Sequence, residues 1–394
     1  MYAMTDRKDK RYYFDWAASA PFDITQTQPH YGNPSSLHSE GRAAKQAIED
    51  ARQKCADVLQ VPPQTLYFTS GGTESNSIAI LSNLMRKGNG RIISSLAEHA
   101  SVRDAMETLD RLGKPVGVIT VDSGGRVTAE NLQKVLEKFE GIRFCSIMAV
   151  NNEVGSVNDI ACLRDVMRKY TEKKAPVHFH CDLVQAVGKM PLDISNWEID
   201  SASISAHKFC GPRGIGLLYL RRPAGQGGIE ILYKGGGQEN GIKGGTENIQ
   251  GAVSLAECLE KYANPKTVTE NHARALERWN RLTSSLMAME RCTIIPVHRT
   301  ARNTNGNEFS PYILQAAFKN IPGEVMARAL DDMGFAVSTG AACSSSSPER
   351  PVLKAMGVEE NLRIEGIRIS QGFTTTDQDI EALINAITEV LKFL

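Results

Sequence analysis

The sequence predicts an α/β protein, with a mostly parallel seven-stranded sheet flanked by helices and then a smaller α+β domain. Short runs of β-branched and apolar residues alternate with stretches of helical periodicity up to about residue 250. Strands that alternate with helices in this way form parallel, doubly wound sheets. Beyond Gly251 the pattern changes to a long helix, followed by short strands and helices. We therefore predict a large domain over residues 13–250 and a small domain formed by residues 1–12 and 251–394.

The elements of the large domain can be placed in chain order. A turn at residues 32–36 precedes a helix with small or apolar side chains at the helical period as far as Val58, and Pro62-Pro63 ends it. Strands are expected at Leu66–Thr69, Arg91–Ser95, Val116–Val121, Phe144–Val150, Val177–Cys181, Ser201–Ser205 and Ile215–Leu220. Helices are expected from Ser70 through Ile80 and at Thr128–Lys138 and Asp159–Glu172.

Composition limits the classes of partner and compartment. Basic and acidic residues number 45 each and no basic block occurs, so neither nucleic acid nor an anionic membrane is expected as a partner. The N-terminus is polar, unlike a signal peptide, and no apolar run is long enough to span a bilayer. Eight cysteines without a close CxxC pair indicate buried thiols in a reducing, cytoplasmic setting and no zinc or other metal site.

A lysine directly after a predicted strand is the first candidate functional residue. Lys208 follows the strand Ser201–Ser205 and precedes Gly211, which breaks regular structure. Burial disfavours the ammonium form, which lowers the pKa of a lysine and makes its amine a better nucleophile, as a Schiff-base lysine requires. Taken alone, the pattern also fits a surface lysine at the end of a strand.

Other predicted strands also end in polar residues, at the edge of a parallel sheet where ligands bind. Ser70–Thr73 lead into a helix N-terminus, which favours a phosphate but also fits simple capping. His99 fits either stacking on a flat cofactor or an ordinary loop position, and Asn152 follows a further strand. Asp182 needs a cation such as a protonated pyridine nitrogen, or else it caps the next helix. Several such strand ends together favour a ligand site.

The stretches that carry these residues are Thr69–Asn76, Glu98-His99, Val150–Gly155, Asp182–Gln185 and Ser205–Lys208. They resemble the pyridoxal-phosphate site of the cysteine desulfurases, which belong to the aminotransferase class V group of fold type I. The resemblance extends from Tyr12 to the C-terminus. It implies a covalent bond from Lys208 to the cofactor, a contact from Asp182 to the pyridine nitrogen, and His99 stacked on the ring. Further cofactor contacts are implied for Gln185 near the ring hydroxyl, for Asn152, and, at the phosphate, for Gly72, Thr73, Ser205 and His207.

A cysteine in the second half of the chain lies in a run of small and polar residues, Gly340–Ser346. From composition alone, Cys343 is a free thiol in an exposed loop, unlike the other seven cysteines. The resemblance makes Cys343 the sulfur acceptor. It also implies that Arg368 grips the substrate carboxylate, which suits a bidentate guanidinium, and that Asn33 is a second substrate contact.

The glycine-rich stretch at residues 235–248 matches a family loop that reaches into a partner subunit. Thr246 would there touch the cofactor phosphate, so the resemblance implies a homodimer. Lys243 stands where the family usually has arginine, and Ala341 replaces the usual serine two residues before the cysteine. The segment 22–31 is shorter than is usual in the family, which removes a piece near the substrate entrance.

The implied reaction converts L-cysteine to L-alanine, with sulfur held as a persulfide on Cys343. The sulfur would pass to a scaffold or sulfur-carrier protein for iron–sulfur cluster or thio-cofactor synthesis. Lys208 would take the Cα proton, and His99 would help to remove the thiol proton. The alternatives are another pyridoxal-phosphate enzyme of this fold, such as a selenocysteine lyase or an aminotransferase, and a non-catalytic binding subunit. Cys343 argues against an aminotransferase, which needs no thiol.

Overall fold

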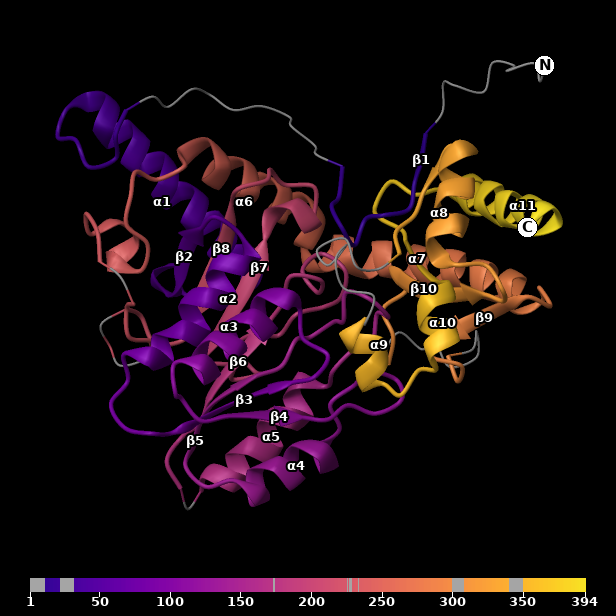
Figure 1. The fold of residues 1–394 in the computed structure, drawn as a ribbon. Helices are drawn as coiled ribbons and strands as arrows, with labels where there is room; N and C mark the ends of the chain where they lie inside the picture. Colours follow the sequence, from indigo (N-terminus) through magenta and orange to yellow (C-terminus); the bar gives the residue numbers. More distant parts are fainter. Residues whose placement is uncertain are drawn as a thin grey trace.

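The computed structural model describes residues 11–21, 32–172, 174–224, 226, 229–232, 234–299, 308–339 and 350–394. Figure 1 shows a large sheet and its helices at the left and a smaller group of strands and helices at the right. Within these ranges no helix combines the length and apolar character needed to cross a membrane. The segment 22–31 and Cys343, both singled out in the sequence, lie outside the described residues.

The larger sheet contains seven strands in the described part of the chain. They are β2 (Leu66–Thr69), β3 (Arg91–Ser95), β4 (Val116–Ile119), β5 (Ile142–Ser146), β6 (His178–Asp182), β7 (Ser201–Ser205) and β8 (Gly216–Leu220). They lie side by side in the order β2-β8-β7-β6-β5-β3-β4. Strand β8 runs antiparallel to both of its neighbours, and the other pairs are parallel. The predicted mostly parallel seven-stranded sheet is confirmed.

Strand β5 ends before the end of the predicted strand Phe144–Val150. The Ala149 N–H still donates to the Asp182 carbonyl at 3.0 Å, so the chain continues alongside β6 for a few residues. Val150 then leaves the sheet to form an antiparallel bridge with Val157. The prediction was therefore right about extended backbone here and wrong about where the sheet ladder stops.

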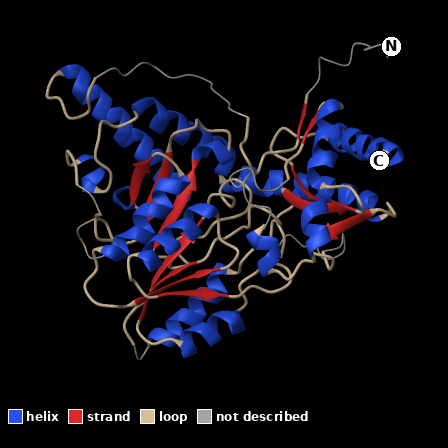
Figure 2. Cartoon of the chain, in the orientation of Figure 1, coloured by secondary structure: helices blue, strands red, loops and turns tan. Residues whose placement is uncertain are grey.

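Helices cover both faces of the larger sheet (Figures 1 and 2). One face packs against α1 (Ser39–Leu59), α4 (Ala129–Lys138), α5 (Ile160–Thr171) and α6 (Ile249–Ala263), and the other against α2 (Gly72–Leu81) and α3 (Ala100–Arg111). Successive side chains of a strand point to opposite faces. Phe68 and Ile93 accordingly pack with the first group of helices, whereas Tyr67 and Ile92 pack with the second.

The smaller region has its own sheet and core. Its strands are β9 (Cys292–Ile295), β10 (Ile313–Phe318) and β12 (Gly366–Ser370), in the antiparallel order β12-β10-β9, and β1 (Tyr12–Tyr13) pairs with β11 (Phe335–Ala336). Its helices are α7 (Pro265–Met287), α8 (Gly323–Asp332), α9 (Pro351–Ala355), α10 (Glu360–Glu365) and α11 (Asp377–Phe393). The single long helix predicted after Gly251 is two helices, α6 and α7, because Pro265 has no N–H and begins a new helix. Tyr262 still packs in the larger core and Trp279 in the smaller one, and the domain boundary near residue 250 stays a prediction.

The two central strands of the larger sheet carry polar side chains on one face. β6 reads His-Phe-His-Cys-Asp and β7 reads Ser-Ala-Ser-Ile-Ser, and all of these residues are buried. Because side chains alternate along a strand, His178, His180 and Asp182 share one face of β6. His180 lies beside Ser201, and Asp182 beside Ser203, in the parallel register of β6 and β7. This polar stripe faces α2, and it is the part of the fold that supports the candidate site.

Candidate active site

A cavity of about 220 Å³ lies at the carboxyl ends of the strands of the larger sheet. Its lining includes Gly72, Thr73, His99, Asn152, Asp182, Gln185, Ser205, His207, Lys208 and Arg368. Most of the residues proposed from the sequence are therefore brought together, although they come from segments far apart in the chain. Further lining residues, among them Asn76, Arg103 and Glu153, were not proposed from the sequence.

Lys208 lies at the edge of this cavity in the short helix η3 (Ala206–Lys208), directly after β7. Its Nζ donates to the carbonyl oxygens of Ala17, at 2.6 Å, and Ala18, at 2.9 Å. The residue is half-buried, which does not fit the alternative of an exposed surface lysine. Its positive charge also contributes to lowering the pKa of His207 to about 4, after the larger effect of burial.

Asp182 ends β6 and is 3% exposed. Its Oδ1 accepts the backbone N–H of Val184 at 2.9 Å, and its Oδ2 accepts the side-chain N–H of Asn76 at 2.9 Å. The carboxylate therefore caps the following turn and also lines the cavity, so the two interpretations drawn from the sequence both apply. A buried carboxylate held by neutral donors still carries a negative charge that a cationic ligand can balance.

His99 occupies the N-cap position of α3. Its Nδ1 accepts the Ser101 N–H at 3.1 Å and lies 2.8 Å from the Ser101 hydroxyl. Burial lowers the pKa of His99, the Lys208 charge adds to this effect, and the Asp182 charge opposes it. The imidazole is therefore predominantly neutral near pH 7, with its Nδ1 edge engaged by the helix N-terminus.

The N-terminus of α2 forms another side of the cavity. Among the described residues, no side chain caps this helix at Gly71, and an uncapped helix N-terminus favours an anionic ligand. A Cβ on Gly72 would lie 2.6 Å from the Val184 side chain, which means that the backbone approaches its neighbours here more closely than any other residue allows. Thr73 and Ser205 line the same region. This side suits an anionic group.

Arg368 also lines the cavity, and it is 3% exposed. Its Nη2 pairs with the Asp15 carboxylate at 2.8 Å, and its Nη1 donates to the Asn152 carbonyl at 3.0 Å. Among the described residues, Arg368 Nε and Asn152 Oδ1 are buried without a hydrogen-bond partner. Burial raises the pKa of the neighbouring Glu153, and the positive charge of Arg368 opposes that rise. A carboxylate ligand would complete the guanidinium fork.

Gln185 is held by a buried lysine that sequence reasoning missed. The Nζ of Lys189 donates to Gln185 Oε1 at 2.7 Å, and Gln185 Nε2 donates to the Ala17 carbonyl at 2.9 Å. Burial lowers the pKa of Lys189 to about 7, with a further contribution from the Lys208 charge. The amide oxygen of Gln185 is therefore occupied by Lys189, and its NH₂ group is the part that faces Ala17.

Asn33 and Thr246, which the sequence pointed to as substrate and phosphate contacts, do not line this cavity. Asn33 is exposed, and its Oδ1 accepts the backbone N–H of Ser35 at 2.9 Å. Thr246 is also exposed. Within one chain the structure therefore does not bring either residue to Lys208, and the contact of Thr246 with a partner subunit stays a prediction.

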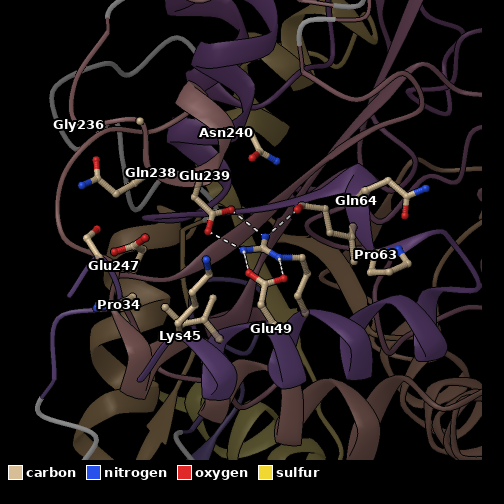
Figure 3. A pocket seen from close by; sticks show the side chains of 15 residues that line it. Pro34, Lys45, Glu49, Pro63, Gln64, Gly236, Gln238, Glu239, Asn240 and Glu247 are labelled. Atoms are coloured by element: carbon tan, nitrogen blue, oxygen red, sulfur yellow. Dashed lines mark hydrogen bonds and ion pairs between the residues drawn. The ribbon is translucent and has the colours of Figure 1, made fainter. Parts of the chain in front are cut away.

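A second cavity of about 480 Å³ lies between α1 and the glycine-rich stretch (Figure 3). Figure 3 shows Glu49 and Glu239 reaching toward one another from α1 and from this stretch. Between them the Arg52 guanidinium donates to both carboxylate oxygens of Glu239 at 2.8 Å and to Glu49 at 3.2 Å. Glu239 also accepts the Phe68 N–H at 2.8 Å. This buried pair ties the glycine-rich stretch to α1 and to β2, the strand that leads into the N-terminus of α2.

The seven cysteines that the structure describes are not all buried. Five of them are buried: Cys55, Cys145, Cys181, Cys210 and Cys258. Burial raises the pKa of Cys55 to about 12, so such a thiol is a poor nucleophile near pH 7. Cys162 is exposed, which corrects the expectation that exposure sets Cys343 apart from the other seven. In the described ranges, no three His, Cys, Asp or Glu side chains are grouped so that they could hold a metal ion.

Asn76, Ser101 and Lys189 contact predicted residues directly, and His180 contacts Asn76; none of these four was proposed from the sequence. The alternating polar pattern of β6 was a signal that could have identified His180, because a charged or polar residue at every second position of a buried strand needs partners. Asn76 offered a weaker signal. It follows the predicted Gly72–Thr73 turn by about one helical turn, on the face that points at the sheet.

This fold and site define an α/β protein that binds its ligand at the carboxyl edge of a mostly parallel sheet. The family model described as aminotransferase class-V matches residues 13–383. The chain belongs to this family, among its cysteine desulfurases.

Relatives match over nearly the whole chain. The cysteine desulfurase IscS of Dictyoglomus turgidum is 34% identical over 393 residues, which cover 97% of this chain and 95% of the relative. The cysteine desulfurase IscS of Vibrio cholerae is 34% identical over 388 residues, covering 95% and 91%. The solved structure of a NifS-like protein has a TM-score of 0.86 at 34% identity, covering 98% of this chain and all of the other. The structure of SspA in complex with cysteine has a TM-score of 0.74 at 29% identity, covering 92% and 98%.

Proposed function

We propose that this protein uses pyridoxal 5'-phosphate to convert L-cysteine to L-alanine and carries the released sulfur as a persulfide on Cys343. The observation that carries the proposal is the single cavity lined by Lys208, Asp182 and Arg368. An amine, a buried carboxylate and a guanidinium around one space suit a covalently held pyridine cofactor and a substrate with a carboxylate. The desulfurase relatives and the neighbouring structure solved with cysteine support the same substrate.

The residues of the cavity fit pyridoxal phosphate. The uncapped N-terminus of α2 and the close backbone approach at Gly72 suit its phosphate. Lys208 would hold the cofactor covalently, and the Asp182 carboxylate would face the pyridine nitrogen. The remaining contacts would come from Thr73, His99, Asn152, Gln185, Ser205 and His207, all of which line the cavity. When bound, the cofactor supplies an electron sink for negative charge at the substrate Cα.

The substrate would be oriented by Arg368. Its Nε–H has no partner among the described residues, and together with the second hydrogen of a Nη group it forms a fork from which a carboxylate accepts in a bidentate way, while Asp15 and the Asn152 carbonyl hold the guanidinium. The amine of Lys208 would remove the Cα proton, because it lies at the edge of the same cavity. Asn33 is not used in this scheme, since it is exposed and does not line the cavity.

Cys343 would perform the step that defines a desulfurase. Its thiolate attacks the substrate Sγ, a new S–S bond forms, and the substrate Cβ–Sγ bond breaks with its electron pair left on the carbon. A proton added to that carbon completes the methyl group of alanine. The persulfide sulfur would then pass to an acceptor protein for iron–sulfur cluster or thio-cofactor synthesis. Thr246 would contribute to the site of a second subunit, so the active form would be a homodimer.

The test is the absorbance spectrum of the purified full-length protein before and after addition of L-cysteine, with alanine and sulfide measured. Wild type should be yellow and release alanine. Lys208→Ala should lose the chromophore that borohydride reduces, and Cys343→Ser should keep the colour but release no sulfide. Cys162→Ser, a change at an exposed cysteine outside the site, is the matched control and should behave as wild type. A colourless protein, or full sulfide release by Cys343→Ser, would contradict the proposal, and preferred turnover of selenocysteine would indicate a lyase.

A further inference from the structure

The polar stripe on β6 and β7 continues behind the cavity as one connected set of hydrogen bonds. The bonded pairs are His178 Nε2 with Ser201 Oγ (2.7 Å), Ser201 Oγ with His180 Nδ1 (2.8 Å), His180 Nε2 with Asn76 Oδ1 (2.9 Å), Asn76 Nδ2 with Asp182 Oδ2 (2.9 Å), Asn76 Nδ2 with Ser101 Oγ (2.9 Å), and Ser101 Oγ with His99 Nδ1 (2.8 Å). The chemistry of the partners determines which atom of each pair donates.

The donor and acceptor of each hydrogen bond can be assigned starting from Asp182. An ionised carboxylate can only accept, so the group of Asn76 that faces Asp182 must be its NH₂. The other end of the amide, Oδ1, then faces His180, and a carbonyl oxygen also only accepts. His180 must therefore carry a hydrogen on Nε2.

The two buried histidines continue the same direction. Burial lowers the pKa of His180 to about 3, and the pKa of His178 to about 3 as well, so both rings are neutral at pH 7. A neutral imidazole has one N–H, so the Nδ1 of His180 must accept, and its donor is the Ser201 hydroxyl. The Ser201 oxygen in turn accepts from the Nε2–H of His178.

A branch from Asn76 reaches His99. The second N–H of the Asn76 amide donates to the Ser101 oxygen, and because the Nδ1 of His99 accepts the Ser101 backbone N–H, the hydroxyl hydrogen of Ser101 is also directed at this nitrogen. The backbone N–H of Ser101 donates to the same nitrogen at 3.1 Å. Two donors on one nitrogen leave neutral His99 with its hydrogen on Nε2.

We propose that His178, Ser201, His180 and Asn76 form a one-way chain of donors that holds Asp182 as an ionised acceptor and His99 in its Nε2–H tautomer. His180 and Asn76 are then positioning residues, because they act through the two residues that face the cavity. The inference rests on the proposed function in one respect, the pairing of Asp182 with a pyridine nitrogen.

This series of hydrogen bonds changes the catalytic role expected of His99. The sequence suggested that His99 helps to remove the substrate thiol proton. A neutral ring whose Nδ1 is occupied by two donors presents a hydrogen on Nε2 instead of a lone pair. His99 therefore enters the reaction as a donor, either to the cofactor or to an atom of the substrate that gains negative charge.

The first measurement is the tautomer of each histidine, by long-range ¹H–¹⁵N NMR on the full-length protein labelled with ¹⁵N-histidine. Signals are assigned by replacing one histidine at a time. His99 and His180 should each show a protonated Nε2 and an unprotonated Nδ1. A protonated Nδ1 on either ring would overturn the proposed direction. The tautomers do not depend on catalysis, so this measurement tests the direction of the hydrogen bonds independently of the proposed function.

The second measurement compares pyridoxal phosphate affinity in His180→Leu and His180→Gln by absorbance titration of cofactor-depleted protein. Leucine fills the space but has no donor, whereas glutamine places an N–H near the position of Nε2. Affinity should fall roughly tenfold for leucine, the effect of one lost buried hydrogen bond, and stay within about twofold of wild type for glutamine. Equal losses in the two variants would show a packing role only and overturn the proposal.

Ser201→Ala keeps the test decisive if the leucine variant fails to fold. It leaves His180 Nδ1 without its donor and should weaken pyridoxal phosphate binding roughly threefold, between the two His180 variants. If Ser201→Ala left both pyridoxal phosphate binding and the His180 tautomer unchanged, Ser201 and His178 would have no part in the proposed series of hydrogen bonds. A wild-type protein that binds no pyridoxal phosphate would refute the proposed function, while the tautomer measurement would still decide the direction of the hydrogen bonds.

Discussion

The two sides of the cavity differ in how completely their polar groups are paired. On the paired side (Asn76 and Asp182, with His180 behind them), each side-chain nitrogen and oxygen has a partner at 2.8 or 2.9 Å. On the open side (Asn152 and Arg368), Asn152 Oδ1 and Arg368 Nε are buried with no partner among the described residues. Asn152 as a whole is only half-buried, but its Oδ1 and the Arg368 Nε are themselves buried atoms, so exposure of these atoms to water does not account for the difference.

The difference indicates which ligand each side serves. A buried polar group without a partner costs about 1–3 kcal/mol, so an unpaired side is retained where a ligand supplies the missing bonds. A fully paired network is rigid and keeps its charges oriented in advance. The paired side therefore suits a cofactor that stays bound through many turnovers, and the open side suits a substrate carboxylate that arrives and leaves.

Breaking the paired side should have the largest effect. Asp182→Asn keeps the shape but removes the charge, and its NH₂ group meets the NH₂ of Asn76 or loses the Val184 contact. We expect kcat/KM for L-cysteine to fall roughly a hundredfold or more, with weaker pyridoxal phosphate binding. Asp200→Asn is the control, since that carboxylate accepts the Phe179 N–H at the far end of the same strands. Normal activity in Asp182→Asn would show that the paired side does not act on the cofactor.

A substitution on the open side should have a smaller effect, and the effect should be limited to substrate binding. Arg368→Lys replaces a planar fork with a single point charge, so KM for L-cysteine should rise roughly 10- to 100-fold. The cofactor absorbance should match wild type, because the paired side is untouched. Arg281→Lys, at an exposed arginine paired with Glu381, should change neither quantity. Loss of the cofactor in Arg368→Lys would mean that the two sides are not separate.

The sequence predicts the paired side better than the open side. Lys208 and Asp182 follow strands whose ends could be read directly from alternation, so their meeting at one sheet edge follows from parallel topology. The pattern His-Phe-His-Cys-Asp in β6 predicts a polar face but not its partner, because the register with β7 and the docking of α2 depend on the whole core.

Other parts of the site could not be predicted for related reasons. Arg368 lies in β12 of the smaller sheet, and periodicity gives no information on how that sheet packs against the larger one. Asn33 matched a motif, yet it is exposed and away from the cavity, because the position of a loop is not encoded in its own few residues. Lys189 was missed because it lies in a stretch of turns after β6 that has no regular pattern, and only the structure shows its bond to Gln185.

The smallest expected effect concerns Lys189, which supports the paired side from behind Gln185. Burial lowers its pKa in the folded protein to about 7, whereas the unfolded chain has the ordinary value of 10.5. Between these values the unfolded state binds the extra proton, so this group adds stability as the pH rises from 7 toward 10.5 and the contribution is lost as the pH falls to 7.

Lys189→Met fills the same space without a titrating group. The free energy of unfolding in urea of wild type relative to this variant should increase by up to about 1.4 kcal/mol per pH unit between pH 7 and 9.5. Pyridoxal phosphate affinity should weaken only about two- to fivefold, because Gln185 loses one donor but keeps its bond to the Ala17 carbonyl. A pH-independent difference in unfolding free energy would show that Lys189 is charged in the folded protein. The paired side would then contain a buried cation next to Lys208, and its fit to a positively charged pyridine ring would rest on Asp182 alone.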